Sequence, residues 1–311
     1  MPHKKILLIA NPNAGNKCLK RKWESDIHPF LKSKLKKFDV AFTKKAGDAT
    51  TIAREANQND YNIVVAMGGD GTINEVANGF LENSKPINPN CTLGILPFGS
   101  GGDFIRTLKI DRDYQKATHA LITKKTKKID VGYIEYKNKT TSPRYFINIA
   151  EIGLGANIMQ RVNAKNKNLP ALLRYLTGTL QGFADYNNIK VRLHLKDQGH
   201  FEVNLTNLVI ANGQYFGRGM RPAPQAKLDD GLFDVIVMKD VNLVNFLINF
   251  PQIYASKKHM TSKILDNYQA SQIEIEVLNP KDDLLTELDG ENHGGGNQKV
   301  SLLHKVITLQ I

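Results

Sequence analysis

The sequence predicts an α/β fold in which an N-terminal domain with a mainly parallel sheet precedes a C-terminal antiparallel β-sandwich. Up to about residue 133, short apolar runs alternate with amphipathic helical patterns. Such alternation indicates a parallel sheet with helices on its faces. Beyond that point strand patterns cluster with few long helices between them, which is typical of a sandwich. We therefore expect domains at 1–133 and 134–299, with the last strand, 300–311, free to return to the first domain.

The first half of the chain contains repeated strand–helix pairs. Short β-branched runs predict buried strands, and apolar residues spaced by three or four predict helices with one buried face. The expected strands are Lys5–Ala10, Phe38–Thr43, Tyr61–Met67 and Thr92–Leu96. The expected helices carry Trp23 to Leu35, Ala49 to Ala56, Ile73 to Phe80 and Tyr114 to Leu121. A parallel sheet built from these strands would gather their carboxyl ends at one edge, where ligands bind in such folds.

The second half is richer in strands. The expected strands are Tyr145–Ala150, Ile189–Leu195, Phe201–Ile210, Leu232–Met238, Gln272–Leu278 and Val300–Ile311. Only two helices are expected, at Leu169–Tyr186 and Leu243–Lys258. A plain core helix is the simpler interpretation of the second.

Composition narrows the class of protein. The 311 residues suffice for two domains with real cores, and a hydrophobic content of 41% is that of a soluble globular protein. No apolar run approaches the roughly 20 residues of a membrane span. The two cysteines, Cys18 and Cys91, and the eight histidines form no metal-binding pattern. We expect a reducing, cytoplasmic location. The net charge of +12 favours anionic partners, but no nucleic-acid-binding motif accompanies it.

A glycine-rich turn reads Gly68-Gly-Asp-Gly-Thr-Ile-Asn-Glu75 and joins a predicted strand to a predicted helix. Glycines let backbone N–H groups approach an anion, and the helix N-terminus favours negative charge. Asp70 would repel a phosphate unless a cation lay between them, so the turn indicates a nucleotide–magnesium site. A capping box formed by Thr72 and Glu75 is the alternative explanation of this pattern.

A second glycine-rich loop, Pro97–Arg106, also follows a predicted strand. It supplies the hydroxyl of Ser100, the carboxylate of Asp103 and the cation of Arg106. A third acid, Asp130, stands at the start of another apparent strand, where a solvated strand-end aspartate is an equally good interpretation. Together Asp70, Asp103 and Asp130 could hold magnesium directly or through waters.

These motifs resemble those of the soluble diacylglycerol-kinase-type lipid kinases, which are related to sphingosine kinases. The resemblance covers nearly the whole chain. It rests on Asn11-Pro-Asn-Ala-Gly15, the Gly68–Glu75 and Pro97–Arg106 loops, Leu228-Asp-Asp-Gly-Leu232 and Leu288-Asp-Gly-Glu291. It implies a set of ATP-binding residues: Asn11, Pro12, Asn13, Ala14, Gly15, Thr43, Gly69, Asp70, Gly71, Thr72, Ile73, Asn74, Glu75, Ser100, Asp103 and Arg106.

The resemblance also assigns roles in the second half. It implies that Asp289 or Glu291 is the general base, and the sequence does not decide between them. It further implies a structural magnesium site that uses the Asp230 side chain and the carbonyls of Lys227 and Leu232. Taken without the family, both Asp-Gly stretches are simply turns.

Two departures from the family's usual Pro-x-Gly-Thr-x-Asn-Asp-Phe pattern are present. Ser100 replaces threonine and keeps the hydroxyl. Gly102 replaces asparagine and removes a side-chain amide from beside the expected phosphates, which puts full activity in question.

The resemblance implies an ATP- and Mg²⁺-dependent lipid kinase that phosphorylates diacylglycerol or a related membrane lipid. The lysine clusters would hold it transiently on an anionic membrane surface, with no nucleic-acid partner. The sequence names neither the lipid nor the oligomeric state, and a homodimer is compatible with it. Two alternatives stay open: a kinase of a soluble substrate resembling NAD kinase, and a catalytically weak lipid- or nucleotide-binding regulator. The Asn-Pro-x-x-Gly element argues against the first, and Gly102 motivates the second.

Overall fold

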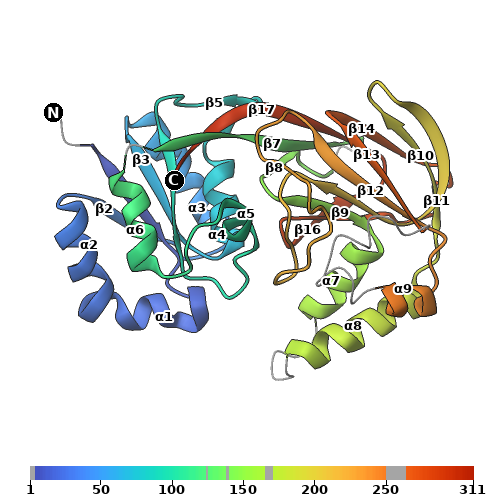
Figure 1. Ribbon diagram of the computed structural model, residues 1–311, viewed down its shortest axis with the longest axis horizontal. Helices are drawn as coiled ribbons and strands as arrows, with labels where there is room; N and C mark the ends of the chain where they lie inside the picture. Colours follow the sequence, from blue (N-terminus) through green and yellow to red (C-terminus); the bar gives the residue numbers. More distant parts are fainter. Residues whose placement is uncertain (1–3, 124, 138–139, 165–170, 250–263) are drawn as a thin grey trace. The chain divides into compact units, whose positions relative to one another are not determined.

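The computed structural model describes residues 4–123, 125–137, 140–164, 171–249 and 264–311. The chain divides into two compact units (Figure 1). Unit 1 comprises residues 1–131, 228–231 and 303–311, and unit 2 comprises residues 132–227 and 232–302. The predicted fold class is confirmed, since unit 1 has a parallel sheet covered by helices and unit 2 is built from antiparallel strands.

The sheet of unit 1 has the strand order β2-β1-β3-β6, and all of these pairs are parallel. Its strands are β1 (Ile6–Ala10), β2 (Asp39–Phe42), β3 (Ile63–Gly68) and β6 (Thr92–Pro97). The end of β17 (Gln298–Gln310) adds a further parallel neighbour, with Leu309 opposite Leu93. Residues 303–311 thus belong to the first unit although they lie at the far end of the sequence.

Helices cover both faces of this sheet (Figure 1). One face packs against α1 (Ala14–Lys22), a π-helical turn (Trp23–Ile27), α2 (His28–Leu35) and α6 (Tyr114–Ile122). The other face packs against α3 (Asp48–Gln58) and α4 (Asp70–Asn78). Strand side chains alternate between these faces, so that β1 is buried along its whole length. The remaining elements of unit 1 are β4 (Leu81–Glu82), β5 (Lys85–Pro86) and α5 (Asp103–Leu108).

Unit 2 is organised around β11 (Gly199–Ala211), which is long enough to serve several neighbours. It pairs antiparallel with β10 (Ile189–Leu195), β12 (Phe233–Lys239) and β9 (Ile149–Gly153). Further pairs extend this sheet through β15 (Leu285–Leu288), β16 (Glu291–Gly295), β13 (Leu265–Ala270), β14 (Gln272–Val277), β7 (Thr126–Tyr136) and β8 (Arg144–Phe146). The large apolar core between these strands includes the stacked rings of Phe146 and Phe233.

Three helices are described in unit 2, two of them where the sequence predicts a helix. The expected helix Leu169–Tyr186 is observed as α8 (Ala171–Asp185), and α7 (Leu154–Ala164) was not expected at all. The expected helix Leu243–Lys258 is observed as α9 (Leu243–Asn249), while residues 250–263 lie outside the described residues. Val244 and Ile248 on α9 are 64% and 66% exposed, so these two apolar side chains lie outside the core. Among the described residues, no helix has the length and apolar character needed to cross a membrane.

Candidate active site

The loops that follow β1, β2 and β3 are joined by hydrogen bonds in unit 1. The N–H of Asn11 donates to the carbonyl of Met67 at 3.0 Å, and its side-chain amide donates to Thr72 Oγ1 at 3.2 Å. The N–H of Thr43 donates to the carbonyl of Ala10 at 3.0 Å. The predicted Asn11–Gly15, Thr43 and Gly69–Glu75 segments therefore lie at one edge of the sheet, as the strand order requires.

Two glycine loops touch backbone to backbone. A Cβ atom on Gly99 would lie 2.3 Å from Gly69 Cα, and one on Gly15 would lie 2.4 Å from the carbonyl oxygen of Phe98. No other residue type fits at such separations, because real Cβ contacts are never this short. The loops after β1, β3 and β6 thus pack together through backbone atoms, because glycine has no side chain to separate them.

Asp70 accepts backbone hydrogen bonds from the second glycine loop. Its Oδ2 accepts from the N–H groups of Gly102 and Asp103 at 2.8 and 3.3 Å, and its Oδ1 accepts from Phe104 at 3.2 Å. These donors stand at the start of α5, where N–H groups have no partner within the helix. The carboxylate therefore ties the loop after β3 to the loop after β6.

Two of the three predicted magnesium ligands lie around one glycine. A Cβ atom on Gly101 would lie 2.8 Å from Asp70 Oδ2 and 3.9 Å from Asp103 Oδ2. Two carboxylate oxygens facing the same small space suit a hard cation and its waters. Asp70 and Asp103 thus lie near each other, and their magnesium role stays a prediction.

Asp130 is engaged elsewhere in unit 1. Its fully buried carboxylate accepts from the N–H groups of Gly231 and Lys305 at 2.8 and 2.7 Å, and His304 Nδ1 lies 2.9 Å away. In the described parts of the chain, no three His, Cys, Asp or Glu side chains form a group that could hold a metal ion. The structure thus does not bring Asp130 together with Asp70 and Asp103, and Asp130 instead anchors the 228–231 turn to β17.

That turn contains Asp230, the predicted ligand of a structural magnesium. The carbonyl of Leu228 accepts the N–H of Asp130 at 2.6 Å, and Asp229 pairs with Lys127 at 3.1 Å. Lys227 and Leu232 flank the turn in the sequence. The magnesium role of these three residues stays a prediction.

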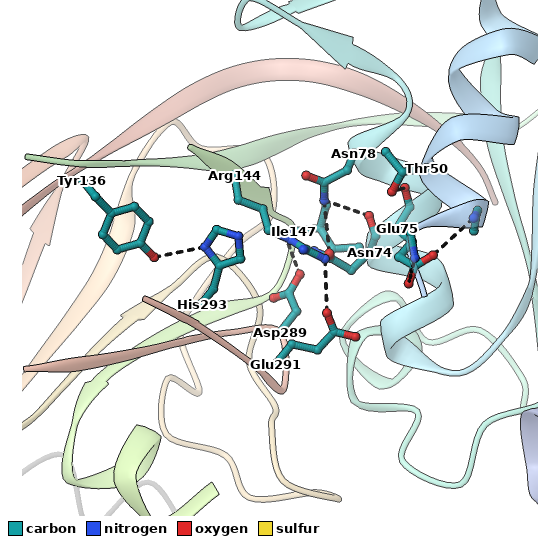
Figure 2. Close-up of polar contacts among 12 residues, drawn as sticks. Thr50, Asn74, Glu75, Asn78, Tyr136, Arg144, Ile147, Asp289, Glu291 and His293 are labelled. Atoms are coloured by element: carbon teal, nitrogen blue, oxygen red, sulfur yellow. Dashed lines mark hydrogen bonds and ion pairs between the residues drawn. The ribbon is translucent and has the colours of Figure 1, made fainter. Parts of the chain in front are cut away.

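The capping box between Thr72 and Glu75 does not form. Helix α4 begins without a side-chain cap, and Glu75 reaches α3 instead. Its carboxylate accepts from the N–H groups of Gly47 and Ala49 at 3.0 and 3.2 Å, and its carbonyl accepts from Thr50 Oγ1 at 2.8 Å (Figure 2). Glu75 therefore fixes the N-terminal end of α3 against α4, a contact that the local pattern could not reveal.

Arg112 was not recognised in the sequence, yet it binds the second glycine loop. Its Nη2 donates to the carbonyls of Ser100, at 3.4 Å, and Gly101. Gly102 adopts φ = +66°, and a Cβ atom there would lie 3.0 Å from Arg112 Nη2. Glycine at position 102, where the family usually has asparagine, thus leaves space that the guanidinium of Arg112 occupies. Arg106, by contrast, is an exposed residue of α5.

In unit 2, Asp289 and Gly290 form the two-residue turn of the β15–β16 hairpin. Their φ angles are +50° and +93°, as a turn with two left-handed residues requires. Asp289 Oδ2 accepts from the N–H of Ile147 at 2.9 Å (Figure 2). Its Oδ1 accepts from the N–H groups of Asn148 and Ile149 at 3.0 and 2.9 Å. Asp289 thereby anchors the turn to the chain that enters β9.

Glu291 is placed differently, although it lies only two residues further. Its side chain is 49% exposed and pairs with Arg144 at 3.2 Å (Figure 2). His293, on the same strand, lies 3.4 Å from the hydroxyl of Tyr136, and burial followed by the charge of Arg144 lowers the pKa of its imidazole. Glu291 is therefore the accessible carboxylate of the predicted pair, and Asp289 is the anchored one.

Comparisons with known proteins match both halves of the chain. Residues 5–134 match the family model described as the diacylglycerol kinase catalytic domain, and residues 148–310 match the YegS C-terminal NAD kinase beta sandwich-like domain. The chain is 30% identical over 299 residues to the diacylglycerol kinase of Bacillus subtilis, covering 94% of this chain and 91% of that protein. It is 34% identical over 221 residues to a probable YegS-like lipid kinase of Chromohalobacter salexigens, covering 68% of each.

A crystal structure of a proposed diacylglycerol kinase from Bacillus anthracis is also similar. It superposes with a TM-score of 0.75 at 25% sequence identity, covering all of this chain and 98% of that chain. The similarity therefore extends over both units of the fold.

Proposed function

The chain belongs to the family of diacylglycerol-kinase-type lipid kinases, and on this basis we propose that it transfers the γ-phosphate of ATP to the hydroxyl of diacylglycerol or a related membrane lipid. The observation that carries the proposal is the contact between the glycine loops of unit 1, where Gly69 and Gly99 meet without side chains. Glycine loops at the carboxyl ends of parallel strands are a recurrent means of binding phosphates.

In the proposed complex, unit 1 holds the nucleotide. The N–H groups of the loops after β1 and β3 bind phosphate oxygens, and Asn11 and Thr72 position these loops through their mutual hydrogen bond. Asp70 and Asp103 would hold magnesium through waters. Magnesium supplies positive charge that offsets the charge developing on the transferred phosphoryl group. Asp70 would thus have two roles, because it would hold magnesium and it accepts hydrogen bonds from the N–H groups at the start of α5.

Glu291 is the proposed general base. Its exposed carboxylate accepts the proton of the lipid hydroxyl as that oxygen forms a bond to the γ-phosphorus. The bond from this phosphorus to the oxygen that bridges it to the β-phosphate then breaks, and ADP leaves. Arg144, which pairs with Glu291 at 3.2 Å, orients this carboxylate in the resting protein. Asp289 acts through the turn, because its lone pairs are engaged by three backbone N–H groups.

Replacing Asp70 with Asn should weaken ATP binding and turnover together. The amide keeps one oxygen acceptor, but its NH₂ group would face N–H donors of the Gly102–Phe104 segment and would carry no charge for magnesium. We expect the KM for ATP to rise and turnover to fall, each by roughly tenfold or more, since lost hydrogen bonds to a charged group cost about 1.5–3 kcal/mol. Magnesium titrations of turnover should shift to higher concentrations in the variant. A variant with the wild-type magnesium dependence would contradict the metal role of Asp70.

A panel of acceptors separates the candidate functions. Purified protein would be given ATP labelled in the γ-phosphate together with diacylglycerol, phosphatidylglycerol, a sphingoid base and NAD in mixed micelles. We expect label in a lipid, with diacylglycerol preferred. Label found only in NADP would instead establish the soluble-substrate kinase. ATP binding with no labelled product would favour the regulator that the departure at Gly102 suggests.

We further propose that the protein works in the cytoplasm while docked on an anionic membrane surface. The net charge of +12 and the lysines near residues 32–37 and 124–128 support this, since each well-placed Lys or Arg contributes about 1 kcal/mol to such docking. The exposed Leu180 on α8 and Val244 and Ile248 on α9 offer apolar contacts of the kind that enter a lipid interface.

A further inference from the structure

Two buried glutamates lie directly opposite each other in unit 2. Glu151 on β9 and Glu287 on β15 are antiparallel register partners, and they are only 6% and 5% exposed. Register partners project from the same face of the sheet with their Cβ atoms about 5 Å apart. Two carboxyl groups are thus held side by side within the protein.

Gly155 makes room for this pair at the start of α7. A Cβ atom on Gly155 would lie 1.9 Å from Glu151 Oε1 and 2.0 Å from its Cδ. Asn207 on β11 completes the enclosure, because its amide donates to Glu151 Oε1 at 2.7 Å and its carbonyl oxygen accepts the N–H of Gly155 at 3.0 Å. The carboxyl of Glu151 is therefore fixed in one position.

Glu287 connects the pair to the proposed catalytic turn. It stands two residues before Asp289 on β15, opposite Asn292 of β16. The backbone N–H of Gly290, the central glycine of the Asp289–Glu291 turn, lies close enough to this carboxyl to lower its pKa, although burial outweighs that effect. The carboxylate of Asp289 thus anchors the turn, and the carboxyl of Glu287 lies beside the N–H of its central glycine.

No cation balances the two glutamates among the described residues. The described titratable groups on the elements that pair or pack with β9 and β15 are Arg161 on α7, His200 and Glu202 on β11, and Glu291 and His293 on β16. Arg144, Tyr186 and Asp289 lie in adjoining segments of the same unit. Arg144 pairs with Glu291, Arg161 pairs with Asp185, and the hydroxyl of Tyr186 donates to the carbonyl of Leu205. Oε2 of Glu287 is buried without a hydrogen-bond partner. Two adjacent charges in such surroundings are disfavoured, so the pair retains a proton.

The direction of the pKa shifts agrees with this geometry. Burial raises the pKa of Glu151 to about 7. Burial, and then the charge of Glu151, raise the pKa of Glu287 well above its usual value. Deprotonating the pair places a second charge beside Asp289, whose own charge repels it.

We propose that Glu151 and Glu287 share one proton and act as positioning residues that hold the Asp289–Glu291 turn in its active geometry. When the pair loses this proton to solvent, its additional negative charge repels the carboxylate of Asp289. The repulsion displaces the turn, and Glu291 moves with it. This inference rests on the proposed kinase activity, and its consequence is a decline in turnover with rising pH that does not involve the nucleotide loops.

The pH dependence of kinetics tests the positioning role. The kcat for lipid phosphorylation and the KM for ATP would be measured between pH 6.5 and 8.5. For the wild type we expect kcat to fall by about fivefold or more across this range, since the ratio of ionised to protonated forms of a titrating group changes about tenfold per pH unit. The KM for ATP should stay within about twofold, because ATP binds unit 1 in the proposed mechanism.

Glutamine at either position mimics the protonated acid, so the ratio of kcat at pH 6.5 to kcat at pH 8.5 should approach one in Glu151→Gln and in Glu287→Gln. The matched control is Glu274→Gln, which alters a half-exposed glutamate of the same unit that pairs with Lys299. The control should keep the wild-type ratio. A wild-type ratio in both single variants would overturn the positioning role.

Stability supplies a readout that does not depend on catalysis. The shared proton is retained above the unfolded carboxyl pKa of 4.5, because burial raises the pKa values of the pair, so the folded protein binds one more proton than the unfolded chain between about pH 5 and 7. Stability from this source is fully present below pH 4.5 and is lost as pH rises towards 7 and beyond. In urea titrations, the wild-type unfolding constant should therefore rise over this range by about tenfold per pH unit relative to the double variant Glu151→Gln/Glu287→Gln.

Identical pH slopes in the wild type and the double variant would overturn the shared proton. If the slopes differ as expected but no lipid is phosphorylated at any pH, the shared proton stands and the kinase assignment fails. The two failures are thereby distinguished.

Discussion

Replacing Glu291 with Gln should lower lipid phosphorylation by about 10²- to 10⁴-fold, the usual contribution of a general base. The amide preserves the size of the side chain but cannot accept the proton of the lipid hydroxyl. ATP binding should be unaffected, because the proposed nucleotide loops lie in unit 1 and Glu291 lies in unit 2. The measurement is kcat in mixed micelles together with the ATP dissociation constant from calorimetry.

The controls separate the roles of the two turn acids. Glu202→Gln alters a similarly exposed glutamate that pairs with Lys190 and Arg192, and it should leave turnover unchanged. Asp289→Asn should lower the unfolding temperature as well as turnover, because an amide offers one oxygen to three N–H donors. A Glu291→Gln variant with wild-type turnover would refute the assignment of the base.

Replacing Gly99 with Ala should weaken ATP binding severely, the second large effect that we expect. The new methyl group would lie 2.3 Å from Gly69 Cα, and this neighbour is backbone that cannot rotate away. The loops after β3 and β6 must then separate, which removes the arrangement of N–H groups that binds phosphate. We expect the ATP dissociation constant to rise about 100-fold or more, with a loss of about 1–3 kcal/mol of stability from overpacking.

Gly47→Ala is the matched control for that substitution. A Cβ atom on Gly47 would meet nothing within 4 Å, although its φ of +85° makes alanine strained there. This variant should therefore lose stability without losing ATP affinity. If Gly99→Ala bound ATP as the wild type does, the loop contact would have no part in nucleotide binding.

The sequence predicted the features that depend on local periodicity and turn chemistry. Alternating strand and helix patterns identified the parallel sheet of unit 1, because buried parallel strands are continuously apolar. The glycine loops after β3 and β6 were also predicted, because only glycine allows their close approach. The Asp289-Gly290 turn was visible as a dipeptide, and the structure adds that it closes a hairpin.

Features that depend on long-range contacts could not be predicted from the sequence. Thr72 and Glu75 fit a capping box locally, but the N-terminus of α3 offers Glu75 two N–H donors from residues 26 and 28 positions away. The sequence predicts a cation beside Asp70, because its carboxylate would otherwise repel a phosphate. The backbone N–H groups that donate to this carboxylate belong to residues 32 to 34 positions further along the chain. Glu151 and Glu287 become neighbours only through the pairing of β9 with β15. No pattern in one sequence encodes such a register.

Labelling ATP at two different positions tests the central claim most directly. Wild-type protein would be incubated with diacylglycerol micelles and ATP labelled either in the γ-phosphate or in the α-phosphate, and the lipid would then be extracted. A lipid kinase that uses ATP as its donor should place the γ-label, and none of the α-label, in a phosphorylated lipid. Lipid that carries neither label, while γ-label accumulates in a water-soluble product other than inorganic phosphate, would contradict the proposal.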